Sequence, residues 1–339
     1  MNQPELSRSQ GSVTDVRGVR VGHATTPNGR SGCTVLDFPD GAVAGMDVRG
    51  GGAGTRQTDS LRGFHSVQRI NALCLSGGSA LGLSTSQGVL DALREQERGY
   101  AVRGHFVPIV PAAILFDLLV SEGEIPGPRE GRAALLAATE TPQRGSVGAG
   151  AGATVGKWFG VEGAMRGGLG MSSARLGDVS VGILAVVNAF GDILDDKGGL
   201  LAGARDPQQP HVLADTEALL LNGVAYAPAP DLAGMTHTNL IVAVTDAVLT
   251  REEVRHFAAM AHNGVTTSVR PAHLSFDGDV AFGAATGQVD EVVAVDRLGA
   301  LAAKLVALAM RDAVQSAGTL PDLPSWNDRE TWPVANAKS

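Results

Sequence analysis

The chain of 339 residues has few cysteines, few aromatic residues and no long apolar segment. Two cysteines, Cys33 and Cys74, cannot make a disulfide-rich scaffold, and neither lies in a spacing typical of metal ligands. No stretch reaches about 18 uninterrupted apolar residues, so we expect no membrane-spanning helix. Residues 1–10 are polar and lack the apolar core of a secretory signal, which favours a cytoplasmic location.

Basic residues are scarce as well. Lys and Arg total 27 against 35 Asp and Glu, which gives a formal net charge of −8. Without a basic stripe, this charge argues against nucleic acid as the main partner. The eight histidines form no His-x-x-x-His or His-Glu-x-x-His spacing, so we expect no metal site. Hydrophobic residues nevertheless make up 44% of the chain, as in a globular protein.

Strand-like and helix-like patterns alternate between two tails. Residues 1–12 are polar, and residues 317–339 contain three prolines and show little periodicity. The chain between them has no internal repeat and no convincing linker. We therefore predict one domain over residues 13–316.

Two segments, Val179–Val187 and Leu240–Val244, are almost wholly apolar, which is typical of strands buried on both faces. Thr250–Glu253 forms a capping box ahead of an amphipathic helix, and Asp296–Ala317 has leucines spaced by three and four. Further strands are predicted at Cys33–Phe38, Ala42–Val48, Ala72–Leu75 and Val280–Ala284, the first two separated by a Pro39-Asp40-Gly41 turn. These patterns predict an α/β fold with sheets inside and helices outside.

Two glycine-rich segments allow other interpretations. Gly148–Lys157 approaches a phosphate loop, but Ala151 and Trp158 stand where a Walker A loop needs Gly and Ser or Thr. It also lacks the strand and helix context of a dinucleotide site. Ser79 could be a nucleophile on a strand-to-helix turn, but Leu81 stands where that motif has glycine. We favour Ser79 as the N-cap of a helix.

Polar side chains precede two of the predicted strands. Thr238 lies just ahead of Leu240–Val244, and Asp277 and Asp279 flank a glycine ahead of Val280–Ala284. Two close carboxylates shift each other's pKa and can share a proton or orient an ammonium group. If cleavage made Thr238 an N-terminus, its amine, which titrates near about pH 8, could take the hydroxyl proton. Taken alone, the Asp-Gly-Asp segment is more typical of a hairpin turn.

Several blocks follow one another in a specific order over residues 13–315. They are Thr14–His23, Asp47–Arg56, Leu75–Leu83, Val107–Asp117, Gly148–Lys157, Val186–Asp192 and the segments around Thr238 and Asp277. In this order they resemble the L-aminopeptidase/D-Ala-esterase-amidase family of self-processing N-terminal-nucleophile hydrolases. That family includes β-peptidyl aminopeptidases and 6-aminohexanoate-oligomer (nylon oligomer) endohydrolases. The resemblance implies a single-domain four-layer αββα sandwich of the DmpA/ornithine acetyltransferase type.

The resemblance also implies roles for particular residues. Members cut themselves before a Ser or Thr, which then acts as nucleophile. The strand register implies a cut between His237 and Thr238, giving an α-chain of residues 1–237 and a β-chain of residues 238–339. Thr236 is a nearby hydroxyl outside that register.

Four further site residues follow from the same resemblance. Asn188 falls on the asparagine that stabilises the oxyanion, and Lys157 on a lysine near the nucleophile of the nylon-oligomer branch. Asp277 and Asp279 fall on the carboxylate pair of that branch. The implied enzyme needs no metal and no organic cofactor.

The resemblance implies a homo-oligomer, a tetramer of processed protomers, that cleaves small peptides or amino-acyl amides through an acyl-enzyme on Thr238. Two positions depart from the family pattern: His237 replaces the usual Asn, and Asn239 stands where Ser or Thr is frequent. Two alternatives therefore stay open. One is an uncleaved, catalytically silent relative that acts in binding or assembly, and the other an acyltransferase like the ornithine acetyltransferases.

Overall fold

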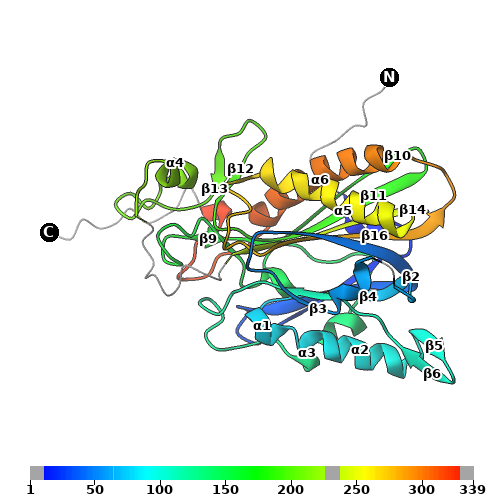
Figure 1. Cartoon of the computed structure of the whole chain (residues 1–339). Helices are drawn as coiled ribbons and strands as arrows, with labels where there is room; N and C mark the ends of the chain where they lie inside the picture. The colour runs from blue at the N-terminus through cyan, green and yellow to red at the C-terminus, as the bar shows by residue number, and fades with distance from the viewer. Residues whose placement is uncertain (1–10, 64, 226–236, 329–339) are drawn as a thin grey trace.

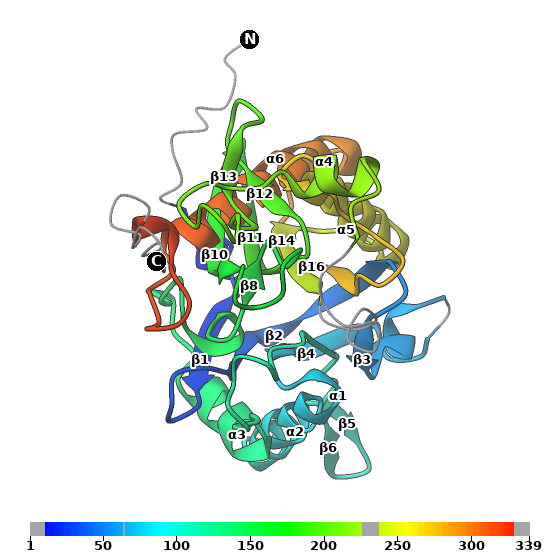
Figure 2. The same cartoon turned by 90° about the vertical axis from the view of Figure 1, so that its left-hand side faces the viewer.

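Four stacked layers make up the protein in the computed structural model, which describes residues 11–63, 65–225 and 237–328 (Figures 1 and 2). The outer helices are α5 (Arg251–Thr266) and α6 (Val295–Gln315) on one side, and α2 (Thr85–Glu95) and α3 (Pro128–Leu136) on the other. Two layers of sheet lie between them. The predicted αββα sandwich is thus confirmed.

The long strand β2 (Gly32–Arg49) belongs to both sheet layers. Its first half pairs with β1 (Arg20–Thr25) and β4 (Arg69–Ser76), and its second half pairs with β16 (Asp279–Val289). The prediction of two strands separated by a turn at Pro39 was wrong. The chain stays extended there, and a bulge in the pairing with β4 absorbs the Pro-Asp-Gly segment.

The layer that carries the site has the order β10-β11-β14-β16-β2. Its other strands are β10 (Gly168–Leu176), β11 (Val179–Asn188) and β14 (Thr238–Ala247). Strand β14 runs antiparallel to β11 and parallel to β16. All residues of β11 and β14 are buried, as predicted for their apolar segments.

The remaining elements are short. The strands are β3 (Gly54–Arg56), β5 (Tyr100–Val102), β6 (His105–Val107), β7 (Ala112–Ile114), β8 (Thr154–Val155), β9 (Met165–Arg166), β12 (Asp192–Leu194), β13 (Leu200–Ala202) and β15 (Val269–Arg270). The remaining helices are α1 (Ser79–Gly82), α4 (Thr216–Leu221) and 3-10 turns at Val13–Asp15, Thr58–Leu61, Gly148–Gly150 and Trp326–Asp328. Strands β3 and β7 extend the second layer beyond β4.

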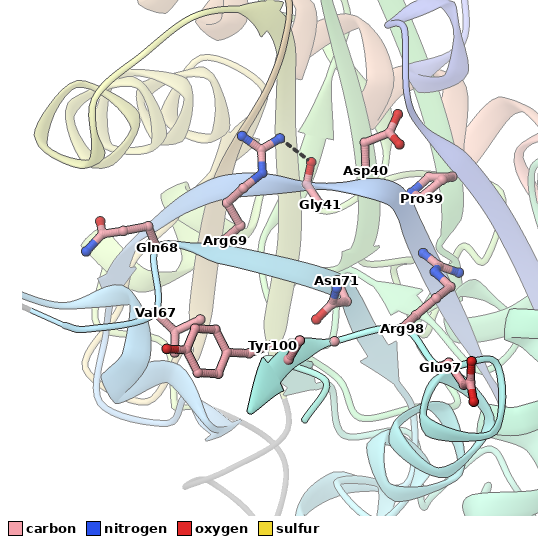
Figure 3. Close-up of a pocket in the computed structure, with 12 residues that line it drawn as sticks. Pro39, Asp40, Gly41, Val67, Gln68, Arg69, Asn71, Glu97, Arg98 and Tyr100 are labelled. Atoms are coloured by element: carbon pink, nitrogen blue, oxygen red, sulfur yellow. Dashed lines mark hydrogen bonds between the residues drawn. The ribbon is translucent and has the colours of Figure 1, made fainter. Parts of the chain in front are cut away.

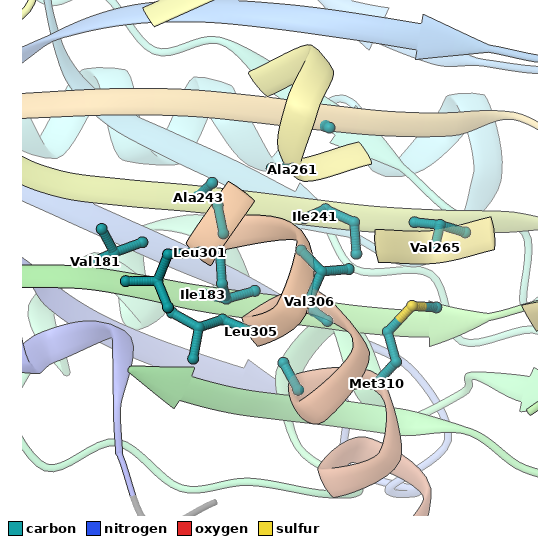
Figure 4. Packing of buried hydrophobic residues seen from close by; sticks show 14 of the residues in the cluster. Val181, Ile183, Ile241, Ala243, Ala261, Val265, Leu301, Leu305, Val306 and Met310 are labelled. Carbon is teal, nitrogen blue, oxygen red and sulfur yellow. The ribbon is translucent and has the colours of Figure 1, made fainter. Parts of the chain in front are cut away.

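Alternating residues of the central strands face different cores. Ile183 and Ala243 pack beneath α5 and α6 with residues such as Leu305 (Figure 4). Leu184 and Val242 face the opposite way, into the core between the two sheet layers. This alternation follows from the period of two in a strand, and explains why the central residues of both strands are apolar on both faces.

Two of the sequence predictions concern the first residues of helices, and only one of them is confirmed. The capping box at α5 is confirmed, because Thr250 Oγ accepts from the Glu253 N–H and the Glu253 carboxylate accepts from the Thr250 N–H. The N-cap prediction for Ser79 was wrong. Gly78 occupies the cap position, and Ser79 is the first residue of α1 with a φ of 53°.

Both cysteines are buried thiols. Within the described ranges, no helix is long and apolar enough to cross a membrane.

Candidate active site

Thr238 begins the central strand β14 and is only 3% exposed. Across the antiparallel pairing its register partner is Asn188, the last residue of β11. On the parallel side, His237 bridges Asp277 and Leu240 pairs with Val280. Strand pairing therefore brings the predicted amide and the predicted carboxylates to opposite sides of Thr238.

The carbonyl oxygen of His237 accepts two hydrogen bonds. Thr238 Oγ donates to it at 2.7 Å, and the Gly278 N–H donates at 2.8 Å. A fixed N–H donor polarises a carbonyl and stabilises an oxyanion that forms there. Glycine is required at 278, because a Cβ would lie 2.8 Å from Thr238 Oγ and 2.7 Å from the backbone of Gly52.

Lys157 and Asn188 form one buried unit. Lys157 Nζ donates to the Asn188 carbonyl oxygen at 2.9 Å and to Oδ1 at 2.8 Å, and the Thr154 N–H donates to the same Oδ1 at 3.1 Å. Asn188 Nδ2 donates to the Phe116 carbonyl oxygen at 3.2 Å. These bonds orient the amide with Oδ1 toward the lysine.

Burial lowers the pKa of Lys157 from 10.5 to about 7, although the nearby carboxyls, Asp277 first among them, favour its charged form. The glycine-rich segment Gly148–Lys157 therefore ends in a buried lysine that contacts Asn188. Its residues Gly148–Gly150 form a 3-10 turn.

The two aspartates have different surroundings. Asp279 Oδ1 accepts from the Asn239 backbone N–H at 2.7 Å and from its side-chain Nδ2 at 3.0 Å. Asp277 Oδ2 accepts from the Leu274 N–H at 2.7 Å, while its buried Oδ1 has no hydrogen-bond partner among the described residues. Burial, and then the charge of Asp279, raise the pKa of Asp277 from 3.8 to about 7.

The hairpin-turn interpretation of the Asp-Gly-Asp segment was wrong. Asp277 makes a parallel bridge with His237, and Asp279 is the first residue of β16. The segment is the entry to a strand beside Thr238. Thr236, the alternative hydroxyl, lies outside the described residues.

Two histidines that the sequence patterns did not single out stand behind Asp279. His273 Nδ1 donates to Asp279 Oδ2 at 2.8 Å, and His262 Nδ1 bonds Asp47 Oδ2 at 2.8 Å. The two rings meet edge to face with centroids 4.7 Å apart. Because His262 and Asp47 are 215 positions apart, no local spacing could reveal this group.

The same group is the part of the described chain that could hold a metal ion. One ring nitrogen each of His262 and His273 and a carboxylate oxygen of Asp279 lie within 4.8 Å of one another. In the structure, however, Nδ1 of each histidine is hydrogen-bonded to a carboxylate. We interpret the group as a support that orients Asp279.

We predict that His273→Leu lowers kcat for amide substrates by about 10-fold or more, because Asp279 loses the donor that holds Oδ2. His273→Asn should retain most of the activity, since its amide nitrogen can take the place of Nδ1. Steady-state kinetics of both variants, with thermal unfolding as a check on folding, tests this. Equal losses in the two variants would contradict a hydrogen-bonding role.

A surface pocket lies elsewhere, between the bulge of β2 and the β5 strand (Figure 3). Its lining includes Asp40, Arg69, Asn71, Arg98 and Tyr100, and Arg69 donates to the Gly41 carbonyl oxygen at 2.6 Å. None of the predicted site residues lines it. The residues with predicted roles lie together around Thr238 instead.

Known proteins share both the sequence and the fold. An uncharacterized aminopeptidase of Mycobacterium tuberculosis is 38% identical, over 94% of this chain and 97% of its own. A 6-aminohexanoate-oligomer endohydrolase of Kocuria sp. is 32% identical, over 84% of this chain and 78% of its own.

Among solved structures, a β-aminopeptidase of Burkholderia sp. superimposes with a TM-score of 0.66 at 21% identity, covering 94% of this chain and 90% of that one. The L-aminopeptidase D-Ala-esterase/amidase of Ochrobactrum anthropi, described as a variant of the Ntn hydrolase fold, also gives 0.66, at 17% identity and covering 97% and 93%.

The protein is thus a hydrolase of the peptidase and amidase class with an Ntn-type fold. Residues 11–323 match the profile of Peptidase family S58, and the chain belongs to that family. The family resemblance in the sequence blocks is confirmed.

Proposed function

We propose that the protein cuts its own chain between His237 and Thr238 and then hydrolyses amide bonds of small peptides or amino-acyl amides. The observation that carries the proposal is the His237 carbonyl, whose oxygen accepts from both the Thr238 hydroxyl and the Gly278 N–H. Thr238 Oγ attacks the carbonyl carbon, and the oxygen becomes an oxyanion held by Gly278. As the C–N bond breaks, the hydroxyl proton passes to the nitrogen, which leaves an ester on Oγ and a free amine on Thr238. Water then hydrolyses the ester.

In the cut enzyme the new amine of Thr238 acts as base for its own hydroxyl. Oγ attacks the substrate carbonyl, the amine passes its proton to the leaving amine, and water hydrolyses the resulting acyl-enzyme. The Asn188 amide stabilises the oxyanion, with Lys157 fixing its orientation. Asp277 and Asp279 orient the amine. Oδ1 of Asp277, which has no partner within the described ranges, is the acceptor for an ammonium group.

The experiment combines intact mass of the purified protein with release of 4-nitroaniline from alanine 4-nitroanilide, with and without an acceptor amine. Two fragments that divide at Thr238 and hydrolysis independent of the acceptor support the proposal. A chain that stays uncut and inactive supports the binding relative instead. Acyl transfer to the amine in preference to water supports the acyltransferase.

We predict that Asp277→Asn stabilises the uncut chain at pH 7. The pKa of Asp277 is raised to about 7, so the folded state holds a proton that the unfolded state releases near pH 4. The stability from this proton is present below about pH 4 and is lost as the pH rises toward 7. Lys157, whose folded pKa burial lowers to about 7, releases its proton in the folded state only near the top of this window, and there it opposes the loss.

In a Thr238→Ala background, Asp277→Asn should raise the free energy of unfolding by about 1–3 kcal/mol at pH 7 and by less at pH 5. Denaturant unfolding at both values measures this. Asp196→Asn, at an exposed turn, is the matched control and should change neither value. An equal gain at both pH values would argue against the shifted pKa as the cause.

We also propose that residues 13–316 act as one domain and that processed protomers assemble into a homo-oligomer, for which light scattering after gel filtration gives the copy number. The cytoplasmic location stays a prediction.

A further inference from the structure

We propose that the aromatic side chains around His237 form the subsite for the acyl residue of the substrate, and that they select a neutral, planar side chain. The candidate substrates are amino-acyl amides and short peptides that begin with an aromatic residue. The inference rests on the proposed self-cleavage and goes beyond it by naming the side chain that the site accepts.

The ring of His237 is enclosed by aromatic neighbours. Its centroid lies 4.9 Å from that of Phe190 and 5.4 Å from that of Phe276, both edge to face. Phe190 and Phe276 are themselves 5.1 Å apart, and Trp158 lies 5.8 Å from Phe190. Edge-to-face contacts at these distances favour a flat ring in the place of His237.

The attacked carbonyl places the substrate in the same surroundings. The His237 carbonyl oxygen already contacts Thr238 Oγ and the Gly278 N–H. A substrate carbonyl that Thr238 attacks must reach the same hydroxyl, so the acyl residue of the substrate takes the place that His237 now occupies. Its side chain then packs against Phe190 and Phe276, where the His237 ring now lies.

Self-cleavage gives a reason for His237 to leave this space. The cut converts its buried carbonyl into a carboxylate close to Asp277 and Asp279. Like charges at short range in a buried site repel strongly. Phe276 and Leu274 are partly exposed, so the cluster reaches the surface and a substrate side chain can enter from there.

Charge in the subsite distinguishes among side chains. Burial, and then the positive charge of Lys157, hold the pKa of His237 far below its usual range, so its ring is neutral. The same two effects oppose a lysine or arginine side chain there. An acidic side chain, although attracted by Lys157, would lose its hydration among Phe190, Phe276 and Trp158.

The test compares kcat/KM for the 4-nitroanilides of phenylalanine, alanine, lysine and glutamate, using protein that intact mass shows to be cut. We expect phenylalanine to exceed alanine by about 10-fold or more, and lysine and glutamate to fall below alanine. Phe276→Ala should reduce the phenylalanine-to-alanine ratio by about 5–10-fold. Phe106→Ala, at a partly exposed phenylalanine of β6, is the matched control and should leave the ratio unchanged.

Phe276→Leu provides a second variant if Phe276→Ala fails to fold, and should give an intermediate ratio because it keeps apolar bulk without the ring. The inference is overturned if cut wild-type protein prefers lysine, glutamate or alanine, or if neither Phe276 variant changes the ratio. Wild-type protein that stays uncut would instead overturn the self-cleavage on which the inference rests. The mass measurement therefore separates the two failures.

Discussion

Replacing Thr238 by alanine is expected to leave one uncut chain of 34.7 kDa and to abolish amide hydrolysis. The substitution removes Oγ, the proposed attacking atom, which now donates to the His237 carbonyl at 2.7 Å. The loss should be at least about 10³-fold, as for removal of a nucleophile that acts together with its base. Intact mass and 4-nitroanilide hydrolysis measure the two effects on the same sample.

Two further variants make this experiment specific. Thr238→Ser keeps a hydroxyl and should still be cut, whereas Thr236→Ala keeps the proposed nucleophile and should be cut normally. If Thr236→Ala blocks the cut and Thr238→Ala does not, the nucleophile is Thr236. If both remain uncut like the wild type, the silent binding relative becomes the better hypothesis.

Asn188→Ala is expected to lower kcat by about 10²–10³-fold with a smaller change in KM. The amide lies directly across the strand pairing from Thr238, and one lost oxyanion donor typically has an effect of this size. The variant also takes from Lys157 Nζ the Oδ1 acceptor at 2.8 Å, so the rate of self-cleavage should fall as well.

The readout for Asn188 must separate catalysis from folding, because the residue is fully buried. Activity per folded molecule, with the folded fraction taken from thermal unfolding, makes that separation. Asn222→Ala, at the exposed end of α4, is the matched control and should leave kcat unchanged. If the Asn188→Ala protein is destabilised but has a normal kcat per folded molecule, Asn188 has only a structural role.

The best sequence predictions concern elements with a strong local signal. The apolar segments of β11 and β14 are buried along their whole length, and the Thr250 capping box starts α5 as expected. Hydrophobic period and capping depend on neighbours within a few residues, so they can be read from one sequence.

The errors occurred where a distant part of the chain overrode a local preference. Pro39-Asp40-Gly41 favours a turn, yet β2 continues through it because both halves of the strand are held by pairing with β4 and β16. Ser79 favours a cap position, but Gly78 adopts the left-handed conformation there, and the Asp117 carboxylate accepts from its N–H at 2.7 Å. Long-range hydrogen bonds of this kind leave no local trace.

By itself, the sequence determined the α/β layering, the family and the position of Thr238 at the head of a buried strand. Only the tertiary structure decided what surrounds Thr238, because each neighbour reaches it through strand pairing or packing over long separations. The Gly278 N–H on the His237 carbonyl, and the support of Asp279 by His273 beside His262, depend on the parallel pairing of β14 with β16 and on the packing of α5. The sequence specifies the chemical groups of single residues, but the distances between those groups depend on the fold.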